Sequence, residues 1–282
     1  MTEQKKVTSK NLKKIDKQPL DTKKKRQIRG IIVWTVGLIL WALISLIAAQ
    51  FIVGYLMVLV IRRENILNPV PTAIFSVLSY LLAFCLIVFL PPLVFNGLKK
   101  DNKKPKDRKK TKFVTLKTLG IDGWVTWTDI GLSIGGLVVY FILGAILLNI
   151  FSVFPWFNVE QNQDIIFNKN IYGFDRMLAF ITLVVIAPIA EELVFRGYLY
   201  GRMREKFSQV TTQLTAAIIA SLLVSILFGI VHLQWNVGVN VFALSLVACA
   251  MREFTGTIYA GILLHMIKNG LAFYFLFVLG IS

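Results

Sequence analysis

The chain alternates between long apolar stretches and shorter polar ones, and the apolar stretches are long enough to cross a membrane as helices. A spanning helix needs roughly 20 consecutive, mostly apolar residues. Eight stretches are candidates, the last of them short: residues 31–61, 72–95, 130–154, 174–200, 215–232, 236–250, 255–268 and 271–282. This pattern predicts an all-α polytopic membrane protein with about eight transmembrane helices.

The positive charge of the chain is separated from these apolar stretches. The chain has 31 Lys and Arg against 15 Asp and Glu, although 56% of its residues are hydrophobic and only 16% are charged. Average soluble domains have about 45–50% apolar and 25% charged residues. Residues 1–29 hold 11 basic and 3 acidic residues, and residues 96–129 hold 10 and 4. The composition argues against a soluble protein, and the segregated charge favours membrane orientation over nucleic-acid binding.

The same distribution predicts the topology. Basic loops stay on the cytoplasmic side of a membrane, so the N-terminus and the 96–129 loop belong there, and eight crossings would return the C-terminus to that side. We therefore divide the chain into a basic cytoplasmic tail (1–29), N-terminal transmembrane helices (30–173) and a second group of helices (174–282). The basic tail and loop either bind anionic lipid, at about 1 kcal/mol per basic residue near the surface, or only set the topology.

A few ionisable residues lie deep in the predicted spans, where charge is costly and usually functional. They are Glu191, Glu192, Arg196, His232, His265 and Lys268. This set contains both histidines of the chain, although the tail and loops had ample room for histidine.

Helical geometry separates the two neighbouring acids. Adjacent residues on a helix differ by about 100° in direction, so Glu191 and Glu192 cannot both point into one site. Glu192 and Arg196 have the i,i+4 spacing at which a carboxylate and a guanidinium can pair. Glu191 is then left without a local partner and is suited to acid–base chemistry. Pro188 cannot donate its backbone hydrogen bond, and a kink there would open space beside Glu191.

Three other polar residues can reach the level of Glu191. His265 and Asn269 are also spaced i,i+4, and counting about 1.5 Å per residue from the helix ends places Glu191, His232 and His265 near one mid-membrane level. A carboxylate, two imidazoles and a carboxamide in a dry cavity predict a hydrolytic or metal-binding site. The alternative is structural: the Glu192–Arg196 pair can be a clamp, and a buried histidine can simply bond to a neighbouring helix.

These residues form three ordered motifs that resemble a known family. Residues 191–196 match Glu-Glu-x-x-x-Arg, residues 228–232 match Phe-x-x-x-His, and residues 265–269 match His-x-x-x-Asn. Together they are similar to the CPBP (CAAX protease and bacteriocin-processing, or Abi) family of intramembrane endopeptidases. The resemblance covers residues 174–282, which would then be the catalytic membrane domain with a buried active site. The helices before it match no motif.

The resemblance implies a role for each motif residue. Glu191 would be the general base and would activate a water molecule together with His232. His265 and Asn269 would polarise the scissile carbonyl and stabilise the oxyanion, and Glu192 and Arg196 would support the site. No cofactor is certain. Zinc is an option, and Glu191, His232 and His265 would be metal ligands only if a metal is bound.

The resemblance also implies a class of partner, a membrane protein or peptide substrate, in a bacterial plasma membrane. Two other functions remain open from the sequence. One is a non-catalytic membrane interaction or bacteriocin-immunity protein on the same fold. The other is an ion-coupled transporter, because intramembrane Glu and His also build proton relays. No internal repeat of the kind common in transporters is visible.

Overall fold

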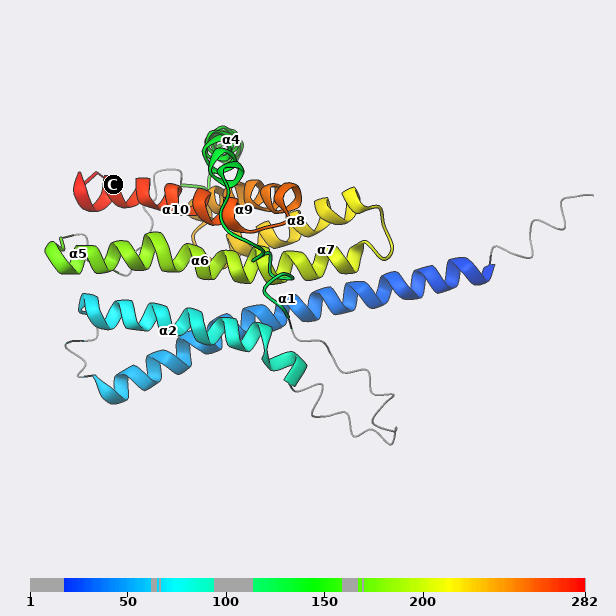
Figure 1. The fold of residues 1–282 in the computed structure, drawn as a ribbon, viewed down its shortest axis with the longest axis horizontal. Helices are drawn as coiled ribbons and strands as arrows, with labels where there is room; N and C mark the ends of the chain where they lie inside the picture. Colours follow the sequence, from blue (N-terminus) through cyan, green and yellow to red (C-terminus); the bar gives the residue numbers. More distant parts are fainter. Residues whose placement is uncertain are drawn as a thin grey trace, which may run out of the picture.

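The computed structural model describes residues 18–61, 65, 67–93, 114–158, 167–168 and 170–281, with side chains from Thr22 onward, and no strand occurs among them. The helices, in which η marks a π-helical segment, are α1 (Gln18–Val60), α2 (Pro69–Val88), α4 (Trp127–Phe151), α5 (Gly173–Phe180), η3 (Ile181–Ile186), α6 (Ala187–Glu192), η4 (Leu193–Tyr200), α7 (Gly201–Phe207), α8 (Gln213–Ile230), α9 (Trp235–Thr255), α10 (Tyr259–Phe273) and η5 (Tyr274–Val278). Their arrangement is shown in Figure 1. The all-α prediction is confirmed.

Within the described residues, seven helices are long and apolar enough to cross a membrane. The expected seventh and eighth spans are one helix, Tyr259–Val278, so the expected break between them is absent and the described residues contain seven candidate spans where about eight were expected. Gly270, which lies between the two expected spans, is helical, and a Cβ built on it would lie 3.6 Å from Val184, in ordinary contact. A single glycine costs a helix only about 1 kcal/mol relative to alanine, so it does not end this one.

The ends of the described chain lie at opposite ends of the bundle. In Figure 1 the C-terminal end lies at the same end of the bundle as the C-terminal end of α1, away from the point where α1 begins. An odd number of crossings, as counted among the described residues, would likewise separate the two termini. The fold does not show on which side of a membrane either terminus lies, so the expectation that both are cytoplasmic stays a prediction. The helix α1 also starts at Gln18, so the part of the 1–29 tail that is described is helical, and residues 1–17 and most of the 96–129 loop lie outside the described residues.

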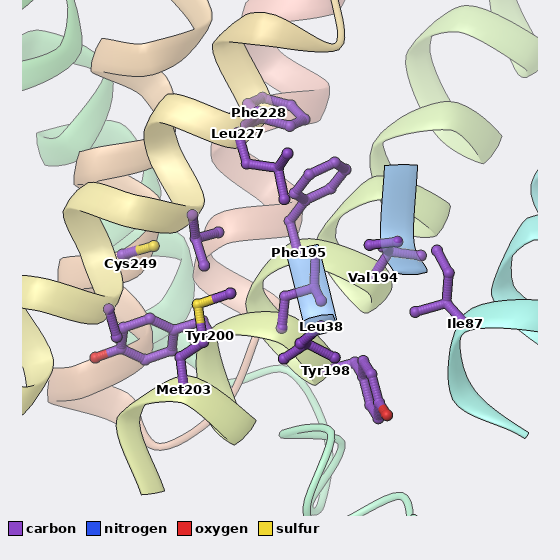
Figure 2. Packing of buried hydrophobic residues seen from close by; sticks show 14 of the residues in the cluster. Leu38, Ile87, Val194, Phe195, Tyr198, Tyr200, Met203, Leu227, Phe228 and Cys249 are labelled. Carbon is purple, nitrogen blue, oxygen red and sulfur yellow. The ribbon is translucent and has the colours of Figure 1, made fainter. Parts of the chain in front are cut away.

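A large apolar cluster joins the N-terminal helices to the C-terminal ones. Figure 2 shows side chains from five elements that meet there: Leu38 of α1, Ile87 of α2, Phe195 of η4, Leu227 of α8 and Cys249 of α9. The outer surfaces of the helices remain apolar, as on α1, where the side chain of Phe51 is 76% exposed. Large apolar surfaces of this kind fit contact with lipid.

The helices that carry the three motifs are held close together. The continuous helix formed by α5, η3, α6, η4 and α7 packs against α2, α8 and α10, and α9 packs against α8, α10 and α4. At the start of the α8–α9 hairpin, a Cβ on Gly229 would lie 2.9 Å from the backbone oxygen of Gly238, and the reverse distance is 3.0 Å. Only glycine permits this approach, which fixes the turn that follows α8 and contains His232.

Candidate active site

The acidic pair lies on α6, a short α-helical segment between two π-helical segments. The backbone N–H of Ala187 bonds to the Thr182 carbonyl, five residues back, at the end of η3. Pro188 follows and has no N–H to donate. The helix therefore widens at the proline, without ending, directly before Glu191 and Glu192. π-Helical bulges inside α-helices are frequent at functional sites.

Glu192, Arg196 and His265 form a buried ionic cluster. An Nη1–Oε1 distance of 3.0 Å separates Arg196 from Glu192, and their side chains are 1% and 0% exposed. The same Oε1 atom lies 3.1 Å from Nδ1 of His265 on α10. A carboxylate oxygen can only accept, so Nδ1 of His265 is the donor. The predicted i,i+4 pair is thus present, and it also orients the histidine.

Glu191 is less buried, with 17% of its side chain exposed, and its two carboxylate oxygens have different neighbours. Tyr80 of α2 donates its hydroxyl to Oε1 at 2.8 Å. The other oxygen, Oε2, lies 3.8 Å from Nε2 of His265, which is too long for a direct hydrogen bond. Glu191 therefore has no partner on its own helix, as predicted, but it has one from α2.

Sequence reasoning missed Tyr80. It lies 111 positions from Glu191 in a helix without a recognised motif, and a tyrosine within an apolar span is common. The available signal was a polar residue on the same side of the predicted helix as Thr72 and Ser76, at spacings of eight and four residues. That pattern indicates a helix face but not its partner.

His232 lies in the turn after α8, and the backbone orients its ring. Its Nδ1 is 2.7 Å from the carbonyl oxygen of Phe228, and a carbonyl only accepts, so Nδ1 carries the proton. In the neutral ring Nε2 is then free to accept a proton. The ring of Phe228 lies between the polar groups: its centroid is 4.4 Å from the Arg196 guanidinium carbon, 4.9 Å from the His232 ring and 5.9 Å from the His265 ring.

Asn269 lies one turn after His265 and bonds to the backbone of η3. Its Nδ2 donates to the Leu183 carbonyl at 2.9 Å. In a regular α-helix that carbonyl would accept from Ala187, and in a π-helix from residue 188. Ala187 bonds to Thr182 instead, and Pro188 lacks an N–H. Asn269 therefore satisfies a carbonyl that the proline leaves open, and a second N–H remains on its amide.

The structure thus brings Glu191, Glu192, Arg196 and His265 together through direct contacts. Lys268 and His232 lie within electrostatic range of Glu191. Asn269 hydrogen-bonds to Leu183, which lies eight positions before Glu191 in the same helix.

The same geometry tests the optional zinc site. Within the described part of the chain, no three His, Cys, Asp or Glu side chains are placed to hold one metal ion. Nδ1 of His232 is engaged by a carbonyl and Nδ1 of His265 by Glu192, which leaves Nε2 of each ring free, as in histidines that bind metals. Glu191, His232 and His265 do not form such a three-ligand group as they are placed here, so zinc binding stays a prediction and we derive no step through a metal.

Comparison with protein families gives a match for this region. Residues 173–271 match the family model described as type II CAAX prenyl endopeptidase Rce1-like. The matched segment contains all three motifs and begins at the first residue of α5. No match was found among curated proteins or among solved structures.

Proposed function

We propose that the protein is an intramembrane endopeptidase that hydrolyses a peptide bond with a water molecule activated by Glu191 and His232. The match of residues 173–271 to the Rce1-like family model of CAAX proteases supports this proposal. The observation that carries the proposal is the pair formed by Glu191 and His265. A partly accessible carboxylate faces an oriented imidazole at 3.8 Å, inside helices long enough to span a membrane.

In the proposed reaction, the water oxygen attacks the scissile carbonyl carbon while its proton passes to Glu191. The free Nε2 of His232 helps to orient this water. His265, held by Glu192, donates from Nε2 toward the developing oxyanion when it is protonated, and the free N–H of Asn269 is a second candidate donor. The C–N bond then breaks, and the proton on Glu191 passes to the leaving amine. Positioned donors and a general base are the usual sources of acceleration in such steps.

The Glu192–Arg196 pair has a supporting role in this proposal. It fixes Nδ1 of His265 and thereby the direction of Nε2 toward Glu191. Because both charged side chains are buried, they are inaccessible to a substrate.

We further propose a membrane protein or peptide as substrate and a bacterial plasma membrane as location. The basic N-terminal face would be cytoplasmic. The exposed basic turns of α1 after Thr22 would contact anionic lipid. These inferences follow from the apolar surface around the site and from the separated positive charge.

The test compares the cleavage products of different variants and does not require a known substrate. A deletion strain is complemented with the wild type, Glu191→Gln, His232→Ala or His265→Ala, and new N-terminal peptides in its membranes are quantified by mass spectrometry. We expect products only with the wild type. The control is Glu205→Gln, which alters a carboxylate that is 69% exposed and pairs with Arg202 at 3.6 Å. This control should retain all products.

The same strains separate catalysis from a non-catalytic immunity or scaffold function. If Glu191→Gln restores the deletion phenotype fully while inserted at the wild-type level, and no product depends on Glu191, the protease proposal is wrong.

A further inference from the structure

The contact between Tyr80 and Glu191 connects two parts of the chain that the sequence treats as separate. Tyr80 belongs to α2, which lies outside the matched segment 173–271. Its hydroxyl lies 2.8 Å from Oε1 of the carboxylate proposed as the general base. A hydroxyl that donates to a carboxylate makes a charge-assisted hydrogen bond, which is stronger than one between neutral groups.

The composition of α2 explains how Tyr80 reaches this position. The helix packs against α5, η3, α6 and η4. Its buried residues include the small side chains of Thr72, Ser76 and Ala83, and small residues let membrane helices approach closely. Ser76 donates its hydroxyl to the Thr72 carbonyl at 2.9 Å, within its own helix. Tyr80, one turn later, is long enough to direct its hydroxyl across the interface to α6.

The two oxygens of Glu191 are thereby given different tasks. Oε1 is occupied by Tyr80, while Oε2 faces Nε2 of His265. Among the described residues, the charged or titratable groups that contact Glu191 are Tyr80 from α2 and His265 from α10. Lys268 from α10 and His232 from the turn after α8 lie within electrostatic range of it. A carboxylate free to rotate would present either oxygen to the reacting water. With Oε1 fixed, Oε2 is the oxygen left for proton transfer.

We propose that Tyr80 is a positioning residue for Glu191, so that α2 completes an active site whose other residues lie in the matched segment. The inference rests on the proposed function, in which Glu191 is the base. A purely structural role would be different: the hydroxyl would then only hold α2 against α6, and its loss would lower stability without changing the reactivity of Glu191.

The first experiment needs no substrate. Purified full-length protein in detergent is treated with dicyclohexylcarbodiimide, which reacts with protonated carboxyl groups in apolar surroundings, and adducts at Glu191 and Glu192 are quantified by mass spectrometry. Removal of the Tyr80 hydroxyl leaves Oε1 of Glu191 without its hydrogen-bond partner and open to the reagent. Tyr80→Phe should therefore increase the labelling rate at Glu191 several-fold and leave the rate at Glu192 unchanged.

The matched control is Tyr140→Phe, which removes a hydroxyl from a buried tyrosine in α4. It should not change labelling at Glu191. An equal Glu191 rate in Tyr80→Phe and in the wild type overturns the proposal. So does a Tyr80→Phe variant that fails to fold while Tyr140→Phe folds, because the hydroxyl is then a structural clamp.

The second experiment uses a peptide identified from the cleavage products described above. Loss of a hydrogen bond to a charged group costs about 1.5–3 kcal/mol, which corresponds to roughly tenfold or more in rate. We expect Tyr80→Phe to lower kcat by that factor with KM unchanged, and a rise in KM alone contradicts positioning. If labelling changes as expected but the wild type cuts nothing, the contact stands and the proposed function fails.

Discussion

Glu191 and Glu192 are consecutive residues of α6, yet their carboxylates lie in different surroundings. Glu192 is fully buried beside Arg196, whereas Glu191 is partly accessible and bonds to Tyr80. Removing one partner of a buried ion pair leaves an uncompensated charge in a low dielectric, while removing the charge of a partly accessible group does not. The two residues should therefore respond differently to the same substitution.

Glu192→Gln should lower the stability of the protein far more than Glu191→Gln. The glutamine leaves the Arg196 guanidinium without a counter-charge, at a cost of about 3–5 kcal/mol. The measurement is thermal unfolding in detergent, followed by tryptophan fluorescence. Glu191→Gln should unfold near the wild-type temperature. Equal losses in the two variants would contradict the division into a supporting and a reacting carboxylate.

The contacts of the candidate site differ in how far the sequence could predict them. Glu192 and Arg196 are neighbours on one helix, so their spacing alone predicted the pair. The contact of Glu192 with His265 joins residues 73 positions apart, and that of Glu191 with Tyr80 joins residues 111 apart. Such contacts depend on how helices pack, which no local pattern determines. The chain has only two histidines, both in predicted spans, and this indicated a role for His265. Tyrosine is more frequent in the chain, so its presence in a span gave no such indication for Tyr80.

At the scale of elements, α10 approaches α6 closely because of a glycine. A Cβ on Gly261 would lie 3.0 Å from Oε2 of Glu192 and 3.4 Å from Cβ of Ala248. Gly261 is one turn before His265, so this approach also sets the distance from His265 to the acidic pair. The surroundings of Gly135 in α4 are the opposite, with nothing within 4 Å of its Cβ position.

Gly261→Ala should therefore destabilise the protein, by about 1–3 kcal/mol for an overpacked site, and should reduce cleavage by displacing Glu192 or His265. Gly135→Ala, in open space on a helix, should be neutral or stabilising by about 0.5–1 kcal/mol. Unfolding temperatures and product yields of both variants provide the check. Gly261→Ala should lower the unfolding temperature, whereas Gly135→Ala should leave it unchanged or raise it. A neutral Gly261→Ala would show that α10 can shift freely.

The π-helical segments could not be predicted from apolar periodicity, because their residues are as apolar as those of the rest of the helix. Pro188 gave the one local signal, and we expected a kink. The structure accommodates the proline differently: the preceding turn widens, and Asn269 donates to the Leu183 carbonyl. The side chain of a distant helix thus compensates for a local loss, which explains why the helix continues to Phe207.

This compensation predicts that Pro188 and Asn269 are energetically coupled. Asn269→Leu leaves the Leu183 carbonyl unsatisfied and should cost about 1–3 kcal/mol. In a Pro188→Ala background, the restored N–H allows regular helical bonding, and the same substitution should cost less. A double-mutant cycle of unfolding free energies measures the difference. Strictly additive effects would mean that Asn269 does not replace the bond lost at the proline.

At the scale of the whole molecule, charge and helix count together predict the orientation in the membrane. The basic segments predict a cytoplasmic N-terminal side, and their residues are obvious in the sequence. From the sequence, the seventh predicted span ended at Lys268 and the eighth began at Leu271. In the structure Lys268, Asn269 and Gly270 lie inside one helix, where Lys268 is within electrostatic range of Glu191 and Asn269 bonds to the Leu183 carbonyl. What resembles a loop is a set of residues that belong to the candidate site.

Seven crossings predict opposite locations for two reporters. With the basic N-terminal side in the cytoplasm, chain positions after α2, α7 and α9 lie inside, and positions after α1, α4, α8 and η5 lie outside. In a bacterial host, alkaline phosphatase fused after Ser282 should be active, and a green fluorescent protein fused there should be dark. Fusions in the turn at Gln209, after α7, should show the reverse pattern. Fluorescence after Ser282 would require an even number of crossings and would restore the loop that the sequence suggested between Lys268 and Leu271.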